Sequence, residues 1–267
     1  MTVSGVGSSW TNSGGDYDWF YVGYSGQGSL DITNGGSVST QDAYISRYSE
    51  SEGAVTVSGA GSTWTDSGSL YVSYDNVGTL DISDGGAVSN TTGYIAHEAA
   101  STGAVTVSGA GSIWTNSSEL YVGYEGDGTL DIADGGRVEV IGNTYMARKA
   151  TSSGSVNFDN GTLTTNTFLG TVSDLSGTGV INTKGLISNM DLVFDSAHGL
   201  TRTWTLNGPG QDITINMDVD GSGSIGAGFG GSGSMHISSD MTVQSTDGYL
   251  GYNSGSVGVA SVSGPGS

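Results

Sequence analysis

The chain has 267 residues and a formal net charge of −20, with 26 Asp and Glu residues against 6 Lys and Arg residues. It contains no cysteine, which excludes a disulfide framework and a thiolate metal site. A surface this acidic repels phosphate groups, so nucleic acid is excluded as a partner. No apolar run approaches the roughly 20 residues that a membrane-spanning helix needs.

A repeat of about 50 residues organises residues 1–150. The motif that opens each unit is VSGVGSSW from Val3, VSGAGSTW from Val57 and VSGAGSIW from Val107. The motif that follows it is GSLDITNGGSV from Gly28, GTLDISDGGAV from Gly78 and GTLDIADGGRV from Gly128. Self-similarity at this period is typical of solenoids, in which stacked units build one continuous core.

Each unit contains about six short segments in which apolar and polar residues alternate, and none has the 3.6-residue period of a helix. Six strands make two turns of a three-sided coil. The sequence therefore predicts an all-β, right-handed parallel β-helix (solenoid) with about two three-strand rungs per 50-residue repeat. Alternation directs Val55, Val57, Leu80 and Ile82 into the core.

The rest of the chain follows the repeat less closely. Residues 151–247 keep short alternating segments but lack the sequence motifs of the repeat, and we expect divergent β-helix rungs there. An inserted β-subdomain is the alternative. Residues 248–267 read as the start of a further repeat, truncated at Ser267.

Two aromatic positions recur once per unit and are the leading candidates for a binding surface. One column is Trp10, Trp64 and Trp114, and the other is Tyr21, Tyr71 and Tyr121. An outward line of aromatic rings can stack on sugar rings or dock a protein partner. The alternative is a ladder that only stabilises the coil.

Acidic positions recur as well. Asp31, Asp81 and Asp131 are weak calcium candidates. With two rungs per unit they lie about 10 Å apart along the axis, too far to share one ion. Asp84 and Asp134 each precede glycine, and Asp-Gly favours tight corners. No metal ion or other cofactor is expected.

Catalysis has little support in the sequence. The histidines are scattered and lack a nucleophile motif: His97, His198 and His236. One basic cluster lies near Asp134 and comprises Arg137, Arg148 and Lys149. We predict that the protein is not an enzyme. The alternative is a glycan-active enzyme, a polysaccharide lyase or hydrolase, because one fold hosts many functions.

The unit VTVSGAGS-W-TNS, followed by LYVGY-G-GTLDI-DGG-V, resembles the passenger repeats of type V secretion (autotransporter) proteins and the repeats of PEP-CTERM-associated surface proteins. The resemblance covers residues 1–150 and part of 248–267. It implies an extracellular passenger segment on the bacterial cell surface, acting as an adhesin or as a rigid stalk.

The same resemblance sets the expected partners. They are a protein or glycan on a host or neighbouring cell, or a second copy of the chain through self-association. Membrane contact is expected only through a C-terminal outer-membrane barrel, which is missing from this sequence. An inert structural spacer is the remaining alternative.

Overall fold

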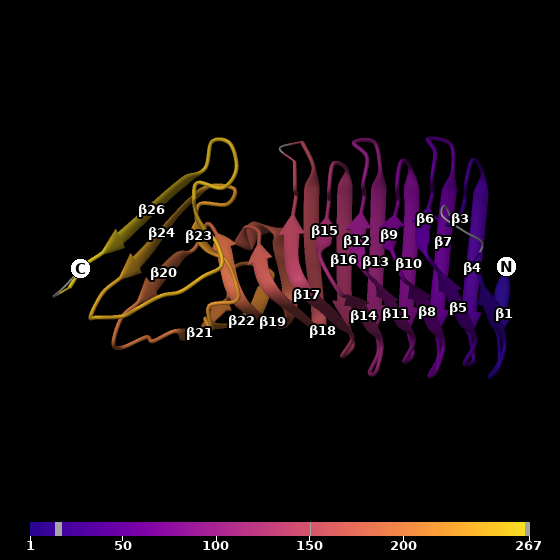
Figure 1. Cartoon of the computed structure of the whole chain (residues 1–267), viewed down its shortest axis with the longest axis horizontal. Coiled ribbons are helices and arrows are strands. Elements are labelled where there is room, and N and C mark those ends of the chain that lie inside the picture. Colours follow the sequence, from indigo (N-terminus) through magenta and orange to yellow (C-terminus); the bar gives the residue numbers. More distant parts are fainter. Residues whose placement is uncertain (14–17, 150, 265–267) are drawn as a thin grey trace.

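The computed structural model describes residues 1–13, 18–149 and 151–264. Residues 265–267, the last three of the predicted further repeat, lie outside this part. The chain winds into a parallel β-solenoid of about ten turns, stacked along the long dimension of the molecule (Figure 1). The predicted fold class is confirmed. Within the described ranges, no helix is long and apolar enough to cross a membrane.

The coil has three faces, each a stack of parallel strands. Face 1 begins with β1 (Thr2–Ser4), β4 (Gln27–Thr33), β7 (Glu52–Ser58), β10 (Val77–Ser83), β13 (Thr102–Ser108) and β16 (Asp127–Ala133). Face 2 begins with β2 (Ser9–Thr11), β5 (Ser37–Thr40), β8 (Thr63–Asp66), β11 (Ala87–Asn90) and β14 (Ile113–Asn116). Face 3 begins with β3 (Trp19–Val22), β6 (Asp42–Ile45), β9 (Ser69–Val72), β12 (Thr92–Ile95) and β15 (Leu120–Val122).

Three long strands continue these faces around the corners. They are β17 (Arg137–Met146), β18 (Ser153–Leu169) and β19 (Leu175–Ser188), with a single 3-10 turn, η1 (Val172–Asp174), between the last two. Each of β18 and β19 supplies a complete turn. Residues 153–188 therefore continue the coil although their sequence has left the repeat.

The register gives the length of one turn. Glu52 pairs with Val77, and Val77 pairs with Thr102, so consecutive turns are 25 residues apart. Two turns per 50-residue repeat are therefore confirmed. From the second turn to the sixth, every turn pairs its backbone with the turn before and the turn after, which makes the coil a stiff rod.

The core is one cluster of buried apolar side chains, mostly aliphatic, that runs along the inside of the coil from Val3 to Ile225. Val55, Val57, Leu80 and Ile82 are at most 2% exposed, which confirms their predicted inward direction. The alternation of face 1 explains this, because Thr56 and Asp81 between them point to solvent.

The corner between faces 1 and 2 depends on residues in the left-handed region. Asn34, Asp84 and Asp134 have φ values of 54°, 53° and 52°, and a glycine with positive φ follows each. Asn and Asp are the side chains that best tolerate this conformation. The corner role predicted for Asp84 and Asp134 is confirmed.

The last turns depart from the regular coil. Face 2 ends with β22 (Gln211–Asp218) and then β21 (Thr201–Leu206), which pairs with β22 in antiparallel fashion. Face 3 ends with β23 (Ile225–Ala227) and β25 (Gly248–Leu250). A separate sheet of β20 (Asp191–Phe194), β24 (Ser232–Ile237) and β26 (Val257–Val262) lies at an angle to the other strands (Figure 1).

Candidate functional site

A column of six tyrosines runs along the outside of face 3. Leu70 and Val72 are fully buried, so Tyr71 between them points outward, as predicted. The register places one tyrosine in each of six successive turns. We call this set the tyrosine column: Tyr21, Tyr44, Tyr71, Tyr94, Tyr121 and Tyr145.

The rings of the tyrosine column stack face to face. Tyr44, Tyr71 and Tyr94 have neighbouring ring centroids 4.7 Å apart, with planes within 6° of parallel. Their ring faces therefore cover one another, and a partner meets ring edges and hydroxyl groups. A sugar ring cannot stack on a free ring face in the middle of the column, contrary to the expectation from the sequence.

A second column lies beside the first, three residues further along each turn. The residue two positions after each tyrosine adopts positive φ, for example Ser73 at 64° and Ala96 at 59°. This conformation turns the chain, so that the next side chain lies beside the tyrosine column. We call this set the flanking column: Tyr24, Arg47, Tyr74, His97, Tyr124 and Arg148.

The flanking column alternates tyrosine with a basic side chain. The Arg47 guanidinium carbon lies 3.9 Å from the centroid of the Tyr74 ring. The His97 ring is sandwiched between Tyr74 and Tyr124, with centroids 4.6 Å and 4.9 Å away and near-parallel planes. These contacts combine cation–π and stacking interactions in one continuous strip.

Burial sets the protonation of the strip. It raises the pKa of Tyr71 and of Tyr121 well above the ordinary tyrosine value, and nearby tyrosines and Glu119 add to this. Their hydroxyls are therefore neutral donors and acceptors. Burial lowers the pKa of His97 against the opposite pull of Glu98, whose Oε1 lies 3.3 Å from His97 Nδ1.

Trp64 and Trp114 are core residues, which corrects the predicted exposed column. Both side chains are 0% exposed because they take inward positions on face 2. The residues on either side of each tryptophan point outward. Trp64 Nε1 donates to Thr40 Oγ1 at 3.0 Å, and Trp114 Nε1 donates to Asn90 Oδ1 at 2.6 Å. Trp10 is half-buried and packs edge-on against Phe20.

The acidic column does not bring its carboxylates together. Thr56 lies between Asp31 and Asp81, and Thr106 lies between Asp81 and Asp131. The carboxylates are thus two turns apart, as the spacing predicted. In the described ranges, no group of three or more His, Cys, Asp or Glu side chains is arranged to hold a metal ion.

The basic cluster predicted near Asp134 is divided between two faces. Arg137 forms an ion pair with Glu139 at 3.1 Å on face 2. Arg148 and Lys149 lie at the end of the flanking column, where Lys149 Nζ is 5.7 Å from the Tyr124 ring centroid. His198 contacts Asp195, and His236 contacts Ser261, so the three histidines have separate surroundings.

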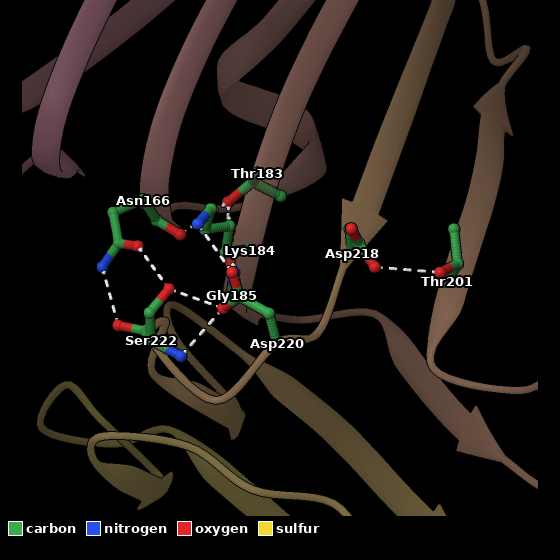
Figure 2. Close-up of polar contacts among 8 residues, drawn as sticks. All are labelled: Asn166, Thr183, Lys184, Gly185, Thr201, Asp218, Asp220 and Ser222. Carbon is green, nitrogen blue, oxygen red and sulfur yellow. Dashed lines mark hydrogen bonds and ion pairs between the residues drawn. The ribbon is translucent and has the colours of Figure 1, made fainter.

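A groove crosses the outside of face 2 near its end and forms a second candidate site. Its volume is about 600 Å³, and its lining comes from β17, β18, β19, β22 and β21. At one end, shown in Figure 2, the Lys184 ammonium donates to Asp220 Oδ2 at 2.6 Å. Asn166 Nδ2 donates to the Ser222 carbonyl oxygen there. The ion pair with Lys184 lowers the pKa of the Asp220 carboxyl group.

Sequence reasoning missed half of the tyrosine column and all of the flanking column. A period of 50 residues groups Tyr21, Tyr71 and Tyr121, and it leaves out Tyr44, Tyr94 and Tyr145, which lie in the turns between and after them. A comparison at 25 residues would have matched LYVSY with GYIAH and found both columns. No sequence pattern predicts the groove, because β21 lies in the part of the chain that lacks the repeat.

No protein-family model, curated protein or solved structure matches this chain. Its geometry provides two outward surfaces with distinct chemistry. One is the strip formed by the tyrosine column and the flanking column, and the other is the groove on face 2.

Proposed function

We propose that this chain is an adhesive segment of a bacterial autotransporter passenger, displayed outside the cell. Its strip of tyrosines and basic side chains would be the surface that contacts a protein or glycan on a host or neighbouring cell, or a second copy of the chain. The resemblance of the repeat wording supports the export route. The stiffness of a coil paired at every turn suits a segment that must project from a surface.

One observation carries the adhesive role, the unbroken strip across six turns. Five intervals of about 4.8 Å make the tyrosine column roughly 24 Å long. Tyrosine and arginine are, with tryptophan, the side chains most enriched at the energetic centres of interfaces. Three of the chain's 6 Lys and Arg residues, namely Arg47, Arg148 and Lys149, contact the rings of this strip.

The test is a binding assay with beads that carry the purified chain. Beads are mixed with intact epithelial or bacterial cells, and bead–bead clustering is followed in parallel. We expect coated beads to bind cells or each other. Replacing Tyr74 and Tyr124 by Ser removes two rings from the flanking column and should weaken binding at least about tenfold, equivalent to about 1.4 kcal/mol.

The matched control is Tyr249→Phe, which changes a tyrosine on face 3 outside the strip. Thermal unfolding followed by circular dichroism checks that each variant keeps its fold. Wild-type beads that bind neither cells nor each other would contradict the adhesive role and leave a stalk or spacer. Release of reducing sugars from a polysaccharide by the wild-type chain would instead favour an enzyme.

A further inference from the structure

We propose that the groove on face 2 binds an extended, uncharged polysaccharide strand that lies along the axis of the coil. The groove is separate from the tyrosine strip, so this proposal does not depend on the adhesive role of that strip. Its lining combines a regular array of hydroxyl and amide groups with one exposed apolar side chain, Ile141.

The array consists of two rows that cross successive strands. The first row follows the outward position at the centre of face 2: Thr164, Asn182, Asn216 and Thr203. The second row lies two residues further along the parallel strands: Asn166, Lys184, Asp218 and Thr201. All eight side chains line the groove. The first row therefore offers one polar group about every 4.8 Å, a spacing suited to a polymer with a short repeat.

The first row is ordered by its own hydrogen bonds. Thr203 Oγ1 donates to Asn216 Oδ1 at 3.0 Å, and Asn216 Nδ2 donates to Asn182 Oδ1 at 3.1 Å. These bonds fix the orientation of the amides before a ligand arrives. A pre-ordered array loses less side-chain entropy on binding, which favours affinity.

The charges of the groove favour a neutral ligand. The cation in its lining, Lys184, is neutralised by Asp220 at 2.6 Å. Asp218 accepts a hydrogen bond from Thr201 Oγ1 at 2.9 Å, and its side chain lines the groove (Figure 2). An anionic polymer would face this carboxylate and the net charge of −20. Sugar hydroxyls can donate to Asp218 at no such cost.

The exposed Ile141 side chain and the position on a sheet favour a saccharide over a peptide. Ile141, 68% exposed, stands at the edge of the groove beside the buried Val140. The C–H face of a sugar ring can pack on such a side chain. An extended peptide gains affinity by pairing with an open sheet edge, whereas this groove lies on the outer surface of strands that are already paired.

The experiment is titration calorimetry of the full chain with three hexasaccharides. Two are neutral, a β-1,4-linked glucan and an α-1,4-linked glucan, and the third is the anionic α-1,4-linked hexagalacturonate. We expect at least one neutral hexasaccharide to bind with a Kd below about 1 mM, and hexagalacturonate to bind at least about tenfold more weakly. Asn182→Ala and Ile141→Ser should each weaken the neutral ligand by about tenfold.

The matched control is Thr115→Ala, which changes the same outward column of face 2 three turns earlier, outside the groove. It should bind like the wild type, and so should the Tyr74→Ser, Tyr124→Ser variant of the tyrosine strip. The proposal is overturned if neither neutral hexasaccharide binds, if hexagalacturonate binds more tightly, or if Asn182→Ala and Ile141→Ser leave the affinity unchanged. If the hexasaccharides fail to bind but the coated beads still bind, the proposal for the groove is rejected and the adhesive role of the tyrosine strip stands.

Discussion

Asp66 is a carboxylic acid inside the coil. It is 3% exposed and follows Thr40 in an inward polar column that continues with Asn90 and Asn116 in later turns. Its Oδ1 accepts a long hydrogen bond of 3.4 Å from the Gly68 amide, and its Oδ2 has no partner. Burial raises the pKa of Asp66 to about 7, although the Gly68 and Thr40 contacts oppose the rise.

This raised pKa gives stability a defined pH dependence. Between about pH 4 and pH 7 the native state holds the proton on Asp66 and the unfolded chain does not. The contribution of this group to the free energy of unfolding is therefore largest below pH 4, falls as the pH rises to 7, and is constant above. Asp66→Asn, which copies the residue of the next two turns, should stabilise the protein at pH 8 by about 1–3 kcal/mol.

Urea unfolding at pH 5 and pH 8 measures this effect. The difference between Asp66→Asn and wild type should be larger at pH 8 than at pH 5. Glu50→Gln, which removes an exposed carboxylate, controls for the change in net charge. A difference that does not change with pH would show that Asp66 is ionised in the folded protein.

At the scale of elements, the corner between faces 1 and 2 is limited by backbone contact between turns. Gly36, Gly86 and Gly136 begin face 2, and a Cβ added to any of them would overlap the carbonyl oxygen of a valine in the turn before: Val3, Val57 or Val107. The two consecutive glycines of the repeat motif are therefore required for two separate structural reasons. The first glycine supplies positive φ, and the second allows close approach.

Gly86→Ala should consequently destabilise the protein by about 1–3 kcal/mol, because neighbouring turns must move apart to admit the methyl group. The control is Gly26→Ala at a corner between faces 3 and 1, where a new Cβ meets no atom within 4 Å. That change should stay within about 0.5 kcal/mol of wild type. Chemical denaturation of both variants compares them, and equal midpoints would refute the contact argument.

Much of this geometry follows from the sequence, and the misses have physical causes. Alternation with β-branched residues and Gly-rich corners predicts the turns and the inward direction of Leu80. The same alternation places Trp64 inside, whereas its recurrence once per unit suggests an exposed aromatic column, and only the structure shows Thr40 accepting its hydrogen bond. The groove could not be predicted, because antiparallel pairing of β21 depends on where a non-repeating segment folds back.

At the scale of the whole molecule, each turn contacts only its neighbours, so stability is shared along the rod. Leu30 and Leu130 occupy the same core column in the second and sixth turns, and both are at most 1% exposed. A cavity in the middle must weaken contacts on both sides. A cavity near one end can be relieved when the outer turns fray.

Leu130→Ala should therefore lower the global free energy of unfolding by about 2–5 kcal/mol. Leu30→Ala should lower hydrogen-exchange protection in the first turns and leave the turns around Leu130 unchanged. Native-state hydrogen exchange read by mass spectrometry resolves the two cases. Equal loss of protection along the chain in both variants would mean that the rod unfolds as one cooperative unit.

The alternation of side chains from turn to turn restricts how such a gene can change its length. Inside the coil, Trp64 and Trp114 alternate with Val38, Val88 and Val138. On the flanking column, Arg47 and His97 are separated by Tyr74. Deleting the turn that contains Val88 would place two indoles in adjacent layers, and deleting the one that contains Tyr74 would place two basic groups together. We therefore expect turns in this part to be added or removed in pairs, which would change the length of the coil in steps of one unit of about 50 residues.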